Sequence, residues 1–314
     1  MKKKKRIKLS ILMVVVIVLC GLAIYALKKT LLINNVETFR ESKKYLKNNG
    51  VKVEEIISKI NKNSIKFNIK SKHGHNIPIE YILSNNNYDN TTIVLVHGHG
   101  MEKTSLYPIA DNVLKHGLNA VLLDLRLHGG NTAKYVTFGY FEKDDVQDVI
   151  DFIKTKMKKE NSIGVLGQSM GAATVGMYSG TEHAGKNIKF AILDCPYNNM
   201  NEIIDTTGIR QGFKPSHVKI LRRIGSIANK MIFGFSYKDV DVCKAVSNTT
   251  VPTLIYCVEN DVVCPYHMAN EIFDSIKHNN KEKIKFKYGG HINGFYKNSE
   301  IYMKSLMSFI SKYK

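Results

Sequence analysis

The chain has 314 residues, of which 46 are Lys or Arg and 27 are Asp or Glu, so its formal charge is +19. This length allows one large domain with a sizeable core, together with an appendage. The basic residues form no stripe interleaved with aromatic residues and accompany no nucleic-acid-binding motif, so a nucleic-acid partner is not expected. A basic surface suits anionic lipid or an anionic cell-wall polymer, but abundant Lys, Asn and Ile throughout favour a general compositional bias.

The N-terminus has the pattern of a membrane anchor. A basic tail, residues 1–9, is followed by the run Ser10–Leu27, which contains 18 residues without a charge. A run of this length between basic flanks is about long enough to cross a bilayer core. A cleaved signal peptide is the alternative, yet the run continues beyond the small residues Gly21 and Ala23. We therefore expect residues 10–27 to be an uncleaved single-pass anchor in the cell membrane, with the remainder outside the cytoplasm.

A stalk and one large domain are expected after the anchor. Residues 28–63 are polar with apolar residues at helical spacing, which is typical of a juxtamembrane helix or stalk. The domain, residues 64–314, opens with a hairpin of strands Ser64–Ile69 and Ile77–Leu83. Further strands are predicted at Thr92–Val96, Ala120–Leu123, Ile163–Leu166, Phe190–Leu193, Val251–Val258 and Lys283–Tyr288. Helices are predicted at Ser105–His116, Phe141–Lys158, His267–Lys277 and Glu300–Lys312.

This alternation predicts an α/β fold with a mainly parallel sheet and helices on both faces. Residues 197–246 interrupt it with helical fragments and little strand pattern. We interpret them as a helical cap inserted over the carboxyl edge of the sheet, with ordinary sheet-covering helices as the alternative. The cap contains many apolar residues, which are expected either to line a substrate pocket or to pack on the domain: Ile220, Leu221, Ile224, Ile232, Phe233 and Phe235.

A Gly-x-Ser-x-Gly pattern stands at the centre of the domain. Gly167-Gln168-Ser169-Met170-Gly171 follows the strand Ile163–Leu166 and leads into a helix. In a nucleophile elbow the serine lies in a strained turn, and a Cβ at either glycine would collide with a neighbouring element. A glycine-rich turn without chemistry is the alternative interpretation of these five residues alone.

A reactive serine needs a base, and the base needs an orienting acid. After an elbow serine the expected order is an acid and then a histidine. Asp261 follows the strand that ends at Val258, and His291 follows the last predicted strand. Both lie at strand carboxyl ends, where open α/β sheets place their sites. Asp194 also ends a strand and is the alternative acid.

From about Ser64 to its C-terminus the chain resembles the α/β-hydrolase superfamily, in particular bacterial membrane-anchored or secreted serine esterases and peptidase-like members. The elbow and the contexts of Asp261 and His291 carry the resemblance, as do Val96-His97-Gly98-His99-Gly100 and Asp124-Leu125-Arg126-Leu127-His128-Gly129. The resemblance implies an oxyanion hole formed by the backbone N–H groups of His99 and Met170. The resemblance also favours Asp261 over Asp194 as the acid, because Asp261-x-x-x-Pro265 leads into a helix as in that family. Asp124 and Arg126 are predicted to be structural, as an ion pair that holds the loop beside the site.

These features predict a membrane-anchored serine hydrolase that cleaves carboxylic esters through an acyl-enzyme on Ser169. A peptidase-like amide hydrolase, transfer of the acyl group to an acceptor other than water, and a non-catalytic binding protein on the same scaffold are the alternatives. We expect an acyl substrate, either a small molecule or a peptide, and no cofactor. No metal is expected because His-Glu-x-x-His and related ligand spacings are absent from the sequence, and the spacing of its cysteines is no metal motif.

Overall fold

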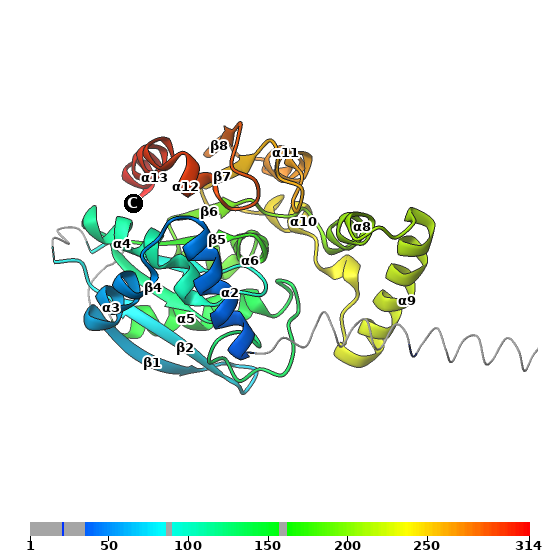
Figure 1. Ribbon diagram of the computed structural model, residues 1–314, viewed down its shortest axis with the longest axis horizontal. Coiled ribbons are helices and arrows are strands. Elements are labelled where there is room, and N and C mark those ends of the chain that lie inside the picture. The colour runs from blue at the N-terminus through cyan, green and yellow to red at the C-terminus, as the bar shows by residue number, and fades with distance from the viewer. Residues whose placement is uncertain (1–20, 22–34, 86–89, 157–161) are drawn as a thin grey trace, which may run out of the picture.

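The computed structural model describes residue 21 and residues 35–85, 90–156 and 162–314 (Figure 1). The predicted basic tail and, apart from Gly21, the predicted anchor lie outside the described residues. Within the described part, no helix is both long enough and apolar enough to cross a bilayer.

One eight-stranded sheet forms the centre of the molecule. Its strands are β1 (Ser64–Lys70), β2 (Asn76–Ile82), β3 (Thr92–Val96), β4 (Asn119–Leu123), β5 (Ile163–Gln168), β6 (Phe190–Asp194), β7 (Thr253–Val258) and β8 (Lys281–Phe286). They lie in the order β1-β2-β4-β3-β5-β6-β7-β8. β2 pairs antiparallel with β1 and with β4, and all other pairs are parallel. The predicted α/β class and the mainly parallel sheet are confirmed.

The central strands are buried on both faces, which explains their unbroken apolar sequences. In β3, Val94 and Val96 face one core while Ile93 and Leu95 face the other. The first core is covered by α5 (Glu142–Lys156), α6 (Met170–Ser179), α10 (Val242–Val246) and α11 (Tyr266–Ser275), and the short helix α7 (Glu182–Asn187) follows α6. The second core is covered by α3 (Val53–Asn63), α4 (Tyr107–Lys115) and α13 (Ser299–Tyr313), with η1 (Lys103–Leu106) and α12 (Gly294–Lys297) beside it.

The region predicted as a stalk instead packs on the domain. α2 (Asn35–Asn48) and α3 carry Leu46 and Ile60, which are buried in the structure. Three polar side chains of α2 also form hydrogen bonds with backbone groups distant in sequence. Ser42 Oγ accepts from Glu102 N–H at 2.9 Å, and Thr38 Oγ1 accepts from Gly129 N–H at 3.2 Å. The Tyr45 hydroxyl donates to Ile292 O at 3.1 Å. Packing of the domain therefore begins at α2 rather than at residue 64.

The insertion has two parts with different surroundings. Residues 197–241 form a helical arm of α8 (Met200–Arg210), α9 (Pro215–Phe233) and η2 (Tyr237–Asp239), which projects from the sheet in Figure 1. A β-bridge between Asn199 and Asp241 closes the base of the arm. α10, the remainder of the predicted cap, lies against α6 and belongs to the first core. α10 is thus a sheet-covering helix, whereas α8, α9 and η2 form the projecting arm (Figure 1).

Candidate active site

Ser169 occupies a strained turn between β5 and α6. Its φ is +54°, a left-handed value that side chains with a Cβ seldom adopt. A Cβ at Gly167 would lie 2.2 Å from Gly171 O, and a Cβ at Gly171 would lie 2.2 Å from Val96 O. The turn is further held by a 2.8 Å bond from Ser169 N–H to Asp194 O. The two glycines therefore permit the close approach of β5 and α6, with Ser169 at the turn between them.

The structure brings Ser169, His291 and Asp261 together. His291 Nε2 lies 2.7 Å from Ser169 Oγ, and His291 Nδ1 lies 2.7 Å from Asp261 Oδ2. A neutral ring with its proton on Nδ1 satisfies both contacts, since Nδ1 donates to the carboxylate and Nε2 accepts from the hydroxyl. The other Asp261 oxygen accepts from the backbone N–H groups of Val263 and Cys264 at 2.8 and 2.9 Å. These bonds fix the carboxylate that orients the ring.

Asp194, the alternative acid, points elsewhere. Its Oδ2 accepts from Gln168 Nε2 at 2.8 Å and from the Tyr302 hydroxyl at 3.1 Å. Burial raises the pKa of its carboxyl to about 6, against the effect of these bonds. Of the two predicted acids, only Asp261 makes a hydrogen bond to His291 in the structure.

The loop after β3 lies over the serine. A Cβ at Gly98 would lie 3.3 Å from Ser169 Cβ, so the backbone that continues to His99 passes close to the Ser169 side chain. Met170 is the first residue of α6, where a backbone N–H has no acceptor within its own helix. The His99 ring stacks on Phe138 with 5.3 Å between centroids, so its side chain packs in the loop.

Two further histidines hold this loop, and the sequence analysis did not assign them that role. His97 Nε2 accepts from Leu125 N–H at 2.9 Å, while its Nδ1 donates to Gly98 O at 2.8 Å. His128 Nε2 accepts from Gly100 N–H at 3.0 Å, while its Nδ1 donates to Arg126 O at 2.7 Å. The loop residues on either side of His99 are therefore fixed by buried imidazoles. The paired occurrence of His-Gly after β3 and after β4 is the sequence signal that could have indicated this.

Both rings are neutral in the folded protein. Burial lowers the pKa of His97 to about 4. Burial, together with the neighbouring His97, holds the pKa of His128 well below its usual value. An imidazole that accepts a backbone N–H at Nε2 cannot be protonated there without breaking that bond. The loop therefore keeps its arrangement only while both rings are uncharged.

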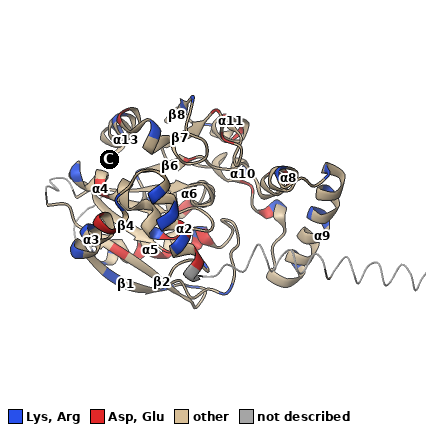
Figure 2. Cartoon of the chain, in the orientation of Figure 1, with Lys and Arg blue, Asp and Glu red and all other residues tan. Residues whose placement is uncertain are grey.

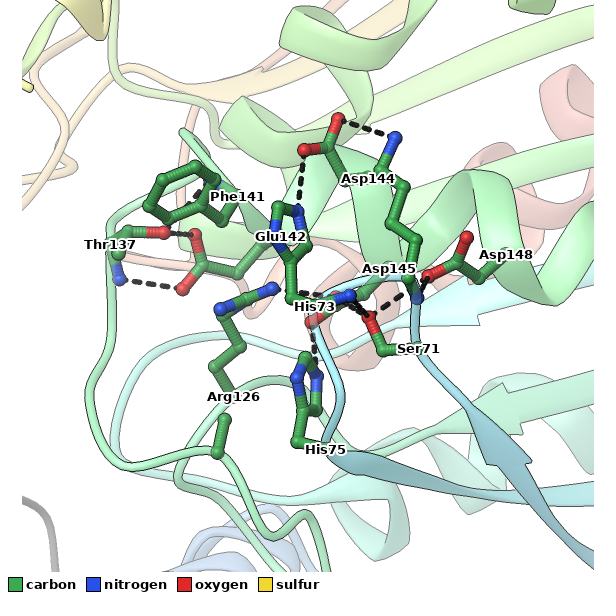
Figure 3. A network of polar contacts seen from close by, with 12 residues as sticks. Ser71, His73, His75, Arg126, Thr137, Phe141, Glu142, Asp144, Asp145 and Asp148 are labelled. Carbon is green, nitrogen blue, oxygen red and sulfur yellow. Dashed lines mark hydrogen bonds and ion pairs between the residues drawn. The ribbon is translucent and has the colours of Figure 1, made fainter. Parts of the chain in front are cut away.

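The predicted ion pair between Asp124 and Arg126 is wrong. Asp124 instead contacts Lys103 Nζ at 2.7 Å and accepts from Gly130 N–H at 2.9 Å. Arg126 donates to Asp145 of α5 at 2.9 Å (Figure 3). His75 Nε2 in the β1–β2 hairpin lies 3.2 Å from Asp145 Oδ2, so this network connects the hairpin to α5. Both residues are structural, each with a partner distant in sequence.

A hollow of about 410 Å³ lies between α2 and the loop after β3. Its lining residues are Glu41, Lys44, Tyr45, Asn48, His99, Gly100 and Met101. α2 therefore lies beside the loop that contains Gly98 and His99. No motif in α2 signals this position, which is why the sequence analysis treated the helix as part of a stalk.

The apolar residues predicted for the cap have three different environments. Phe235 is buried and stacks on Tyr140 with centroids 4.4 Å apart, and Phe233 contacts Tyr135 at 4.6 Å. Ile224 is half-buried. Ile220, Leu221 and Ile232 are exposed by 53%, 38% and 57%. The phenylalanines fasten the arm to the domain, whereas the exposed aliphatic residues neither pack on the domain nor line the hollow.

Two groups of three side chains in the described residues place possible metal ligands within 4.8 Å of one another. One group, Cys195, Asp261 and His291, uses the two residues already hydrogen-bonded to each other beside the serine. The other group joins Glu202 of α8 to His267 and Glu271 of α11 at the base of the arm, where Asn198 Nδ2 donates to both carboxylates. The four described cysteines after the predicted anchor are free thiols.

Comparisons with known proteins agree with this architecture. Residues 91–223 match the family model described as alpha/beta hydrolase fold. The uncharacterized protein YqkD of Bacillus subtilis is 25% identical over 244 residues, which cover 78% of this chain and 78% of YqkD. The esterase Pf2001 of Pyrococcus furiosus superposes with a TM-score of 0.65 at 17% identity, covering 80% of this chain and 91% of the esterase. The esterase EaEST of Exiguobacterium antarcticum superposes with a TM-score of 0.58 at 19% identity, covering 79% of this chain and all of EaEST. Sheet order, family-model match and structural likeness agree that the chain has the α/β-hydrolase fold.

Proposed function

We propose that the protein is a serine hydrolase that cleaves carboxylic esters through an acyl-enzyme on Ser169. The observation that carries the proposal is the unbroken relay from Ser169 Oγ to His291 and on to Asp261, with 2.7 Å at each step. The same hydroxyl lies beside the first turn of α6, whose N-terminal N–H groups favour a developing negative charge. The structural likeness to two esterases supports the ester as substrate class.

The reaction then proceeds in two halves. Ser169 Oγ attacks the carbonyl carbon while His291 Nε2 takes the hydroxyl proton, and the resulting oxyanion accepts from the N–H groups of His99 and Met170. His291 returns the proton to the departing alcohol, which leaves an acyl group on Ser169. Water loses its proton to His291, attacks the acyl carbon, and releases the acid with the serine restored. Asp261 holds the Nδ1–H and stabilises the ring while it is charged.

A kinetic comparison tests this assignment. Wild-type protein should hydrolyse nitrophenyl esters, with slower cleavage of aminoacyl nitroanilides because an amide is the harder bond. Ser169→Ala should lose the ester activity, whereas Ser275→Ala, which alters a half-buried serine at the end of α11, should keep it. Near-wild-type turnover by Ser169→Ala would refute the serine mechanism. A faster rate on the amides than on the esters would favour the peptidase-like alternative.

We also propose that residues 10–27 tether the domain to the outer face of the cell membrane. The proposal rests on the uncharged run and its basic flanks. Protease added to intact cells should digest the hydrolase domain. Protection of the domain would overturn the orientation, and a mature N-terminus near Ile24 would overturn the tether.

A further inference from the structure

The helical arm exposes an unusual share of the apolar surface of the molecule. Thirteen large hydrophobic side chains are exposed among the described residues, and seven of them lie between positions 209 and 232. These seven are Ile209, Phe213, Ile220, Leu221, Ile227, Met231 and Ile232. Clustered exposed apolar side chains mark an interaction surface, whereas scattered ones need no explanation.

α9 has a buried inner face and an exposed outer face. Val218, Gly225 and Asn229 are buried, and their spacing of seven and four residues places them on the face toward α8 and η2. Ile220, Ile227 and Met231 follow the opposite face and are exposed by 53%, 64% and 82%. The half-buried Ile224 completes this stripe, whose spacing is four, three and four residues.

A basic stripe borders the apolar one. Lys219, Arg223 and Lys230 each precede a residue of the apolar stripe, so they lie about 100° around the helix from it. All three side chains belong to exposed residues. Residues 206–238 contain seven Lys and Arg and no Asp or Glu, and Figure 2 shows α9 in tan and blue. Lys230 also lies 4.0 Å from Asp239, which follows the helix. An apolar stripe beside a basic stripe is the arrangement of a helix that lies in a membrane interface.

The charge of this surface selects among possible occupants. A second copy of the arm would bring like charges together, because the arm offers no carboxylate between residues 206 and 238. The apolar run 10–27 has basic residues on both sides and would meet the same repulsion. An anionic lipid surface supplies both an apolar layer and complementary charge. The seven residues between position 27 and α2 extend at most about 25 Å, so a tethered domain would remain near its membrane.

We propose that α9 docks on the anionic lipid bilayer, with Ile220, Ile227 and Met231 in the interface and Lys219, Arg223 and Lys230 against lipid phosphates. The arm is then a second contact with the membrane, additional to the predicted anchor. This inference is independent of the serine chemistry.

The absence of tryptophan from the sequence gives a direct test. Full-length Ile227→Trp is reconstituted into vesicles of phosphatidylglycerol and phosphatidylcholine, and its emission is compared with that of Tyr288→Trp. Tyr288 is equally exposed, at 64%, and follows β8 away from the arm. We expect blue-shifted emission only from Ile227→Trp, with quenching by brominated phosphatidylglycerol. Met231→Trp serves as a second reporter if Ile227→Trp does not fold.

Charge reversal then tests the lipid specificity. Replacing Lys219, Arg223 and Lys230 by Glu in the reporter protein should weaken docking by about 100-fold or more, because each basic residue near an anionic surface contributes about a fivefold effect. An unshifted emission in anionic vesicles would overturn the proposal. A blue shift without quenching by lipid would show that protein, either a second copy or another part of this chain, covers the stripe, and would also overturn it. Equal shifts in purely phosphatidylcholine vesicles would overturn the requirement for anionic lipid.

Discussion

The sheet and the arm both contain isoleucine side chains, but the sheet buries them and the arm exposes them. Ile255 of β7 is completely buried, with α-helices packed on its face of the sheet. Ile227 of α9 is 64% exposed on a helix that has support on one side only. The sheet encloses its apolar side chains and thereby positions Ser169, Asp261 and His291 from three strand ends. The arm leaves its apolar stripe exposed, and the proposed lipid contact would cover that stripe.

The largest effect is expected at the acid of the relay. Asp261→Asn should lower kcat by about 10⁴-fold, because the amide cannot hold the required proton position on His291. Asp194→Asn is the matched control, since Asp194 is equally buried at a neighbouring strand end but bonds Gln168 and Tyr302. It should change kcat only a few-fold. The reverse ranking of the two variants would show that the acid is misassigned.

A pair of isoleucine truncations compares the two regions directly. Ile255→Ala removes methyl groups from the enclosed core and should lower the free energy of unfolding by about 2–5 kcal/mol. Ile227→Ala should change it by less than about 0.5 kcal/mol, because the side chain is mostly in solvent. Denaturant unfolding of the protein without lipid measures both. A large loss for Ile227→Ala would mean that α9 is packed in solution and would remove the distinction between the regions.

A smaller effect on rate is expected at the ring that fixes Gly100. His128→Ala removes the acceptor for Gly100 N–H and should lower kcat by about 10-fold through a less ordered oxyanion loop, with KM little changed. His128→Gln should restore part of the rate, because its amide oxygen can accept the same N–H. Equal rates for wild type and His128→Ala would show that the loop does not depend on this bond.

The same ring predicts a dependence of stability on pH. The unfolded chain protonates His128 near its usual pKa of about 6.5, whereas the folded pKa lies well below that value. The unfolded state therefore binds more protons below pH 6.5, and stability falls as the pH decreases from there. Asp194 acts in the opposite direction, because burial raises its folded pKa to about 6. The difference in melting temperature between wild type and His128→Gln isolates the histidine, and it should narrow as the pH falls from 7.5 to 5.

The strands of the sheet and the order of the site residues could be predicted from the sequence. The strands were predictable because they are buried. Strands such as Thr92–Val96 are enclosed on both faces, so their apolar runs predict them without knowledge of their neighbours. The elbow was recognisable because its two glycines meet a local steric demand. Asp261 and His291 follow strand ends, and parallel strands bring such ends to one edge.

Contacts between distant polar residues were not predictable in this way. α2 reads as a solvated helix, yet Thr38 and Ser42 are buried against the backbone of Gly129 and Glu102. Asp124 and Arg126 are neighbours in sequence, but each finds its charge partner on another element. Ile220 of the outer stripe of α9 was expected to line a substrate pocket or to pack on the domain, yet it is 53% exposed. The sequence pattern indicates which residues are apolar, but the structure is needed to show which part of the protein each residue contacts.

Covalent labelling tests directly whether Ser169 is the nucleophile. A fluorophosphonate should add once to the full-length protein, and mass spectrometry of the digest should place the adduct on Ser169. Ser169→Ala should remain unlabelled, and His291→Ala should label far more slowly because the hydroxyl has lost its base. An unlabelled wild-type protein, or an adduct that persists in Ser169→Ala, would contradict the assignment of Ser169 as the nucleophile.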